Sequence, residues 1–266
     1  LREPTEGSVV FGGEELTTAS ALRMRALRRD LQLVLPDPNA SLNPRWTAGR
    51  IVAEPFDIHR KGDDMRAEVD QLLAAVGLDP EHGDRRPHQF SVEQRQRISI
   101  ARAVALRPRV VVLDEPVAAL DGAARDGVAQ LLAELRDRMG LAYLLLGPSL
   151  AAVRELSDRI AVMYLGKIVE TGPTEEICTS PGHPYTQALV SSPRPTKRAG
   201  ARAGADLGAD APSLANPPSG CRYRARCPRA KDICAVTEPP LLTQSTSGQH
   251  TVACHFPEPI TVGRTH

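Results

Sequence analysis

Two adjacent carboxylates, Asp114 and Glu115, follow the apolar run 110–113. In a sheet protein that hydrolyses nucleotides, the first carboxylate holds magnesium and the second polarises the attacking water. Such a pair belongs at the carboxyl end of a strand, because ligands of open α/β sheets bind there. A strand that merely ends in solvated acids would have the same sequence, so this pattern alone leaves both interpretations open.

A second set of residues with metal-binding chemistry lies in the last fifth of the chain. Cys221, Cys227, Cys234 and Cys254 are separated by five, six and nineteen residues. Zinc ligands are usually paired at two to four intervening residues, so these spacings fit zinc poorly. Four thiolates are also the ligand set of an iron–sulfur cluster, although the spacing does not select it over free or oxidised thiols. Cys178 stands alone, which predicts a small buried residue.

Alternating strand and helix patterns must position the carboxylates. The apolar runs 31–35, 110–113 and 141–146 predict buried strands. Helical patterns lie between and after them, at 63–76, 91–106, 122–138 and 149–156. This alternation predicts an α/β fold with a parallel sheet covered on both faces.

The amino-acid composition limits the classes of protein to which the chain can belong. The chain has 266 residues, of which 41% are hydrophobic and 24% charged, as in a globular protein with a sizeable core. A net charge of +1 argues against nucleic-acid binding and against acidic disorder. No apolar run reaches the roughly 18 residues of a membrane-spanning helix. Because cysteine is absent from residues 1–177, we expect a reducing environment rather than a disulfide framework.

Several motifs then follow one another in a characteristic order. Residues 37–44 read Asp-Pro-Asn-Ala-Ser-Leu-Asn-Pro, and residues 114–116 and 119–121 read Asp-Glu-Pro and Ala-Leu-Asp. Residues 183–186 read His-Pro-Tyr-Thr. The start of a helix at 86–98 and the segment 157–170 complete the series. With these motifs the chain resembles the ATP-binding subunit of ABC transporters, in the oligopeptide/dipeptide (peptide/nickel) importer branch. The resemblance covers almost the whole chain.

The resemblance implies an ABC-type P-loop NTPase domain, incomplete at its N-terminus, with a helical subdomain and a small Cys-rich segment. The ATPase core would comprise residues 1–45 and 107–178, with Walker B, the D-loop and the switch region in the second part. Residues 46–106 would form the helical subdomain with the signature motif. A C-terminal helix and a linker would occupy 179–220, and the cluster-binding segment 221–256.

Roles for individual residues follow from the same resemblance. Glu115 would be catalytic, and Asp114 of Walker B together with Asp121 of the D-loop would bind ATP and Mg²⁺. Ser91 and Gln94 of the signature would contact the ATP held by a partner subunit.

The implied cofactors are ATP, Mg²⁺ and, at the four tail cysteines, a 4Fe-4S cluster, with zinc as the weaker alternative. The implied partners are a second ABC ATPase domain, two transmembrane permease subunits and, indirectly, a peptide-binding protein; nucleic acid is not among them. The chain would sit peripherally on the cytoplasmic face of the cell membrane. By the same resemblance, the stretch Asn39–Pro55 would lie near the surface that receives the permease. Trp46 would be either a contact there or a residue of the core or of a helix interface.

Three positions depart from the family pattern. The Q-loop glutamine falls at Pro36 and the switch histidine at Pro148, so the side chains that orient water and contact the γ-phosphate are missing. The signature reads Ser-Val-Glu-Gln at 91–94, where the family has Ser-Gly-Gly-Gln. Glu93 would bring a negative charge towards the partner's ATP, with a repulsion of at most about 4 kcal/mol at ~4 Å. Ser91 would also N-cap the helix in a capping box with Gln94.

A Walker A loop, G-x-x-x-x-G-K-[ST], is not found either, since none of the four lysines precedes Ser or Thr. We expect the loop to be lost or to lie upstream, on a chain that begins inside something larger. These departures predict the degenerate half of an asymmetric pair, inactive on its own. The alternative is a non-hydrolysing structural subunit, or a redox-responsive one that carries the iron–sulfur cluster.

Overall fold

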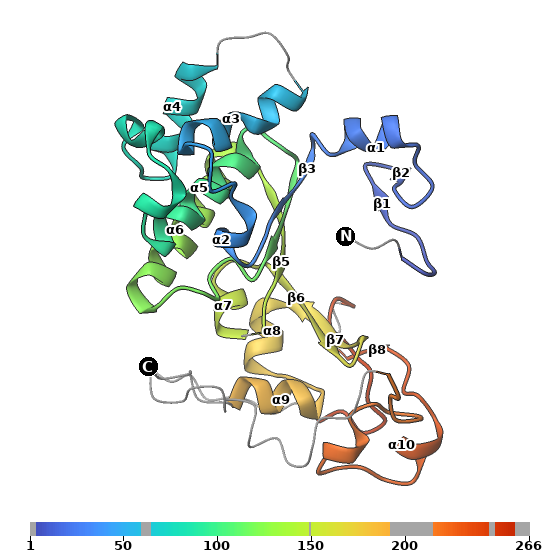
Figure 1. The fold of residues 1–266 in the computed structure, drawn as a ribbon. Helices are drawn as coiled ribbons and strands as arrows, with labels where there is room; N and C mark the ends of the chain where they lie inside the picture. The colour runs from blue at the N-terminus through green and yellow to red at the C-terminus, as the bar shows by residue number, and fades with distance from the viewer. Residues whose placement is uncertain (1–3, 60–64, 149, 192–214, 245–247, 259–266) are drawn as a thin grey trace. The chain divides into compact units, whose positions relative to one another are not determined.

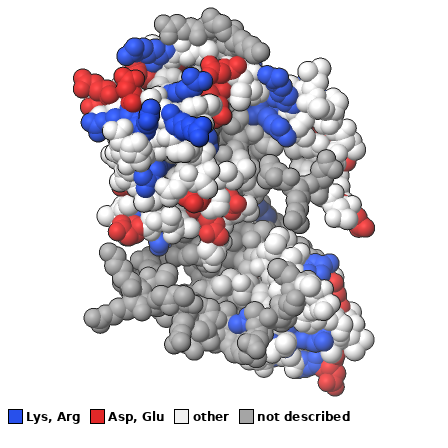
Figure 2. All heavy atoms as spheres, viewed as in Figure 1, with Lys and Arg blue, Asp and Glu red and all other residues white. Residues whose placement is uncertain are grey.

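The computed structural model describes residues 4–59, 65–148, 150–191, 215–244 and 248–258. The chain divides into two compact units, Leu1–Pro148 and Ser149–His266. Within the described residues, no helix is both long enough and apolar enough to cross a bilayer. On the face in Figure 2, both basic and acidic side chains are exposed.

The first unit is built on a three-stranded parallel sheet with the order β3-β4-β5. The strands are β3 (Leu31–Val34), β4 (Val110–Asp114) and β5 (Ala142–Leu146), with β4 in the middle. Strands β3 and β5 are labelled in Figure 1. All three lie within the predicted apolar runs or extend them by one residue, and their parallel pairing confirms the α/β prediction.

Helices supply the rest of the first unit, together with a small antiparallel hairpin near its start. Between β3 and β4 the described segments form helices and loops only, as the sequence predicts for 46–106. The elements are β1 (Val10–Phe11), β2 (Glu14–Glu15), α1 (Ala21–Leu27), α2 (Pro38–Ser41), α3 (Ala48–His59), α4 (Arg66–Ala75), η1 (Pro80–Asp84), η2 (Pro87–Gln89), α5 (Val92–Val104) and α6 (Gly122–Met139).

The two faces of the parallel sheet are covered unequally. Val111 and Leu113 are almost fully buried, and Tyr143 on the same face donates a hydrogen bond to the Leu132 carbonyl of α6 at 2.9 Å. On the opposite face, Leu144 and Leu146 of β5 are 55% and 46% exposed. Helix α6 therefore covers the face that carries Tyr143, and at β5 the opposite face is the more exposed one.

The second unit contains a four-stranded antiparallel sheet with the order β6-β7-β9-β8. Much of the predicted linker, residues 192–214, lies outside the described residues. The elements are α7 (Leu150–Arg154), β6 (Arg159–Tyr164), β7 (Lys167–Pro173), α8 (Thr174–Thr179), α9 (Pro184–Ser191), η3 (Arg224–Arg226), α10 (Ile233–Val236), β8 (Leu242–Thr243) and β9 (Thr251–Val252).

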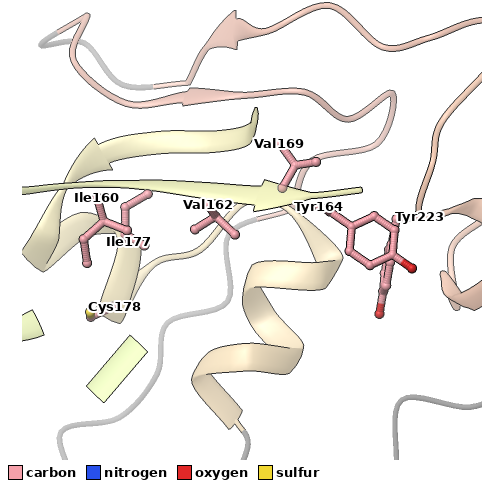
Figure 3. Packing of buried hydrophobic residues seen from close by; sticks show 7 residues of the cluster. All are labelled: Ile160, Val162, Tyr164, Val169, Ile177, Cys178 and Tyr223. Carbon is pink, nitrogen blue, oxygen red and sulfur yellow. The ribbon is translucent and has the colours of Figure 1, made fainter. Parts of the chain in front are cut away.

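A hydrophobic cluster joins the sheet of the second unit to its Cys-rich segment (Figure 3). Tyr223 packs edge-on against Tyr164 of β6, with ring centroids 5.1 Å apart. Cys178 of α8 belongs to the same cluster and is 7% exposed, which confirms the prediction of a buried small residue. The members are Ile160, Val162, Tyr164, Val169, Ile177, Cys178 and Tyr223.

Candidate nucleotide site

The carboxylate pair lies where β4 ends, as the sequence predicts. Asp114 is the last residue of β4, and Glu115 follows it with φ +46°, in the left-handed region. The Glu115 amide donates to the carbonyl of Leu146, the last residue of β5, at 2.9 Å, and the Glu115 carbonyl accepts from Ala118 at 3.1 Å. The sharp turn is thus fixed on both sides, and both carboxylates are half-buried.

The neighbouring strand ends carry proline. Register pairs Leu113 with Val34 and Asp114 with Leu146. Two residues beyond Val34 is Pro36, and two beyond Leu146 is Pro148. Because the carboxyl ends of parallel strands meet at one edge of a sheet, these prolines flank the carboxylate pair. Neither proline can donate a hydrogen bond from its side chain or its nitrogen.

The left-handed backbone at Glu115 leads to a stability prediction. A Cβ atom makes this conformation costly, and glycine removes that cost. We expect Glu115→Gly to be more stable than Glu115→Ala by about 0.5–1 kcal/mol, after subtracting the extra chain entropy of glycine. Urea unfolding of the two purified variants measures the difference. Equal stabilities, or a more stable alanine variant, would show that the backbone here is unstrained.

Asp121 lies in the same loop, at the start of α6. It occupies the N-cap position, but its side chain makes no capping hydrogen bond and is exposed. The loop before it is held by Arg125, which donates to the Leu120 carbonyl at 3.2 Å. The structure therefore presents the Asp121 carboxylate at the surface, on the loop that also carries Asp114 and Glu115.

Ser91 and Gln94 begin helix α5. The Ser91 hydroxyl accepts from the Gln94 amide at 3.1 Å, and the Gln94 side-chain oxygen accepts from the Ser91 amide at 2.9 Å. This is the predicted capping box, and it is confirmed. Arg95 braces the preceding turn by donating to the carbonyls of Phe90 and Pro87 at 2.8 and 3.1 Å. The two signature side chains thus have a local structural role.

The four tail cysteines share one neighbourhood without forming a metal site. Burial raises the pKa of the thiols of Cys221, Cys227 and Cys254, and the neighbouring tail thiols raise each further. Among the described residues, no group of three or more His, Cys, Asp or Glu side chains is arranged to hold a metal ion. The predicted ligand set for a 4Fe-4S cluster or zinc is therefore not supported by the described residues.

The basic residues around the first tail cysteines have structural partners instead. Arg222 donates to the Leu165 carbonyl. Arg224 donates to the Ser219 hydroxyl at 2.9 Å. Further along, Arg229 bonds the Gln187 side chain at 2.6 Å, and Lys231 lies 4.1 Å from the Phe256 ring centroid. These contacts connect the cations to other parts of the second unit.

A buried carboxylate in the second unit was not anticipated from the sequence. Glu170 of β7 is 0% exposed and accepts from the amides of Gly182 and His183 at 2.7 and 3.0 Å. The Nε2 atom of His250 lies 2.7 Å from Glu170, and its Nδ1 atom 3.3 Å from Glu176. The fully buried Glu170 carboxylate thus has polar partners at Gly182, His183 and His250.

His183 completes this arrangement at the start of α9. Burial lowers its pKa to about 4, so the ring is neutral at physiological pH. Its Nδ1 atom can then accept from the Tyr185 amide at 3.0 Å, which fixes the first turn of the helix. The His-Pro-Tyr-Thr motif thus joins α9 to β7. No local spacing links Glu170 to His250, so pattern reasoning had no signal for the pair.

Comparison with known proteins agrees on the class that this architecture defines. Residues 1–118 match the family described as ABC transporter. The ATP-binding cassette MJ0796, solved as a dimer in a post-hydrolysis state with ADP and Pi, is similar at a TM-score of 0.58 and 26% identity, over 65% of this chain and 75% of that one. The cbiO1 protein of Clostridium perfringens shares the fold at a TM-score of 0.59 and 24% identity, over 66% of this chain and 70% of that one. The class is the ATPase domain of ABC transporters.

The branch follows from the rest of the chain. Residues 169–234 match the family described as oligopeptide/dipeptide transporter, C-terminal region. The oligopeptide transport ATP-binding protein AppF of Bacillus subtilis is 44% identical over 96% of this chain and 79% of its own. The di/tripeptide transport ATP-binding protein DppF of Pseudomonas aeruginosa is 41% identical over 97% of this chain and 80% of its own. The chain belongs to the family of ATP-binding subunits of oligopeptide/dipeptide ABC transporters.

Proposed function

We propose that this subunit is the degenerate half of an asymmetric ATPase pair that drives peptide uptake. The observation that carries the proposal is the sheet edge at Glu115, where the adjacent strands continue into Pro36 and Pro148. A catalytic glutamate needs neighbours that orient water and contact the γ-phosphate. Proline provides neither group, so most hydrolysis would take place at the partner's site.

The carboxylates at this edge retain chemistry that suits ATP and magnesium. Asp114, at the end of the central strand, would hold Mg²⁺ through water, and Glu115 would polarise a water molecule. Mg²⁺ would neutralise the charge of the phosphates when bound. Asp121, exposed at the start of α6, would face the partner ATPase domain. Ser91 and Gln94 would present the first turn of α5 to the partner's ATP.

The proposal places the subunit on the cytoplasmic face of the membrane, between a second ATPase domain and two permease subunits. A peptide-binding protein would select the substrate on the other side. Trp46 is a candidate permease contact, because it is only half-buried and stacks with Arg50, whose guanidinium carbon lies 4.8 Å from the ring centroid.

Retention of nucleotide tests the asymmetry directly. The assembled transporter is loaded with a photoreactive radiolabelled ATP analogue, chased with unlabelled ATP for many turnovers and then irradiated. We expect label to remain at the site containing Asp114 and to disappear from the partner's site, because the former hydrolyses slowly. Loss of label from both sites at the same rate would contradict the asymmetric assignment.

A further inference from the structure

The unusual carboxylate of the signature segment has a dedicated partner. Glu93 lies in the first turn of α5. From the sequence, we expect its negative charge to lie near the partner's ATP. In the structure its Oε1 atom accepts from Nε of Arg97 at 2.9 Å and forms an ion pair with Nη2 at 2.8 Å. The two residues are four apart, so they lie on the same face of the helix. Their side chains are 33% and 18% exposed, which protects the pair from solvent screening.

Arg97 is also anchored to a second helix. Its Nη1 atom donates to the carbonyl of Val76, the C-cap residue of α4, at 2.8 Å. A Cβ atom on the next residue, Gly77, would lie 3.0 Å from the same nitrogen. The C-terminal end of a helix attracts a cation, so the guanidinium is bound both electrostatically and by contact.

A third helix closes over the ion pair. A Cβ atom on Gly127 of α6 would lie 3.3 Å from Nη2 of Arg97 and 3.7 Å from Oε1 of Glu93. The absent side chain lets the α6 backbone approach the pair closely. Helix α6 begins directly after Asp121, so one ion pair contacts the helix of the signature and the helix of the D-loop.

From this geometry we propose that Arg97 is a positioning residue for the signature segment. It neutralises Glu93 and holds it against α4 and α6, so that the negative charge stays away from the phosphate-facing end of α5. The segment can then contact the partner's ATP although Glu93 stands where the family has glycine. This inference rests on the proposed role of Ser91 and Gln94 at the partner's nucleotide.

The test is a double-mutant cycle in the assembled transporter, with the apparent KM for ATP as the readout. We expect Arg97→Gln to raise that KM about tenfold, because the freed carboxylate opposes binding of an anion. Glu93→Gln alone should change it less than about twofold, and combined with Arg97→Gln it should restore the original KM. The defect of Arg97→Gln should also shrink as salt concentration rises.

Failure of rescue by Glu93→Gln would overturn the proposal and leave Arg97 with a packing role only. If Arg97→Gln does not assemble, Arg97→Met with and without Glu93→Gln provides the same comparison, since methionine also removes the charge and is an unbranched, adaptable side chain. Ser91→Arg tests the underlying function separately. An unchanged KM in that variant would refute contact with nucleotide, whereas a raised KM without rescue in the cycle refutes only the role of Arg97.

Discussion

Replacing Glu115 with glutamine should lower ATP hydrolysis by the assembled transporter less than about twofold, whereas the same change at the corresponding glutamate of the partner ATPase should lower it at least 100-fold. A positioned general base contributes roughly 10²–10⁴ in rate. Glu115 lacks supporting side chains because Pro36 and Pro148 follow the adjacent strands. The steady-state rate of phosphate release measures both variants.

The two substitutions serve as each other's control, since they remove the same charge from equivalent positions. Co-purification of each variant with the permease shows that assembly is intact. Comparable losses at both positions would make this subunit an ordinary catalytic half, and a loss confined to Glu115 would reverse the asymmetry.

A second large effect is expected at Glu170 of the other unit. Glu170→Ala should lower the free energy of unfolding of this unit by about 3 kcal/mol or more, because it leaves several buried polar groups without their partner, at about 1–3 kcal/mol each. The substitution also removes the acceptor shared by the Gly182 and His183 amides. Hydrogen exchange of the β7 and β9 amides measures the change.

Glu176→Gln is the matched control for this prediction. Glu176 contacts the same imidazole of His250, at 3.3 Å, but its side chain is 36% exposed, so its loss should cost only about 0–1 kcal/mol. Similar effects of Glu170→Ala and Glu176→Gln would show that burial of the Glu170 carboxylate is not what stabilises the unit.

The parallel sheet could be predicted because its signal is local. Runs such as 110–113 are continuously apolar, as buried parallel strands must be, and a carboxylate pair marks where β4 ends. The capping box at Ser91 could also be predicted, because it depends only on the four residues 91–94. The coverage of the sheet was not, since Leu144 and Leu146 are as apolar as the buried residues but lie on the more open face.

The candidate site was predictable in position but not in conformation. Asp114 and Glu115 lie where expected, yet the left-handed turn at Glu115 depends on its bond to Leu146, a residue of another strand. The Glu93–Arg97 pair did have a signal, the four-residue spacing of opposite charges on a helix. The tail cysteines show the opposite outcome: a spacing that allowed a cluster is not accompanied by a metal-holding arrangement in the described residues.

The pairing of β7 with β9 has a consequence for the order of events during synthesis. Glu170 and His250 are 80 positions apart, so the carboxylate leaves the ribosome long before the imidazole that covers it. At about 5–20 residues per second, the interval is roughly 4–16 s. During that time Glu170 must remain hydrated, and β7 has a free edge that can pair with another chain. The second unit can therefore reach its final fold only after β9 has left the ribosome.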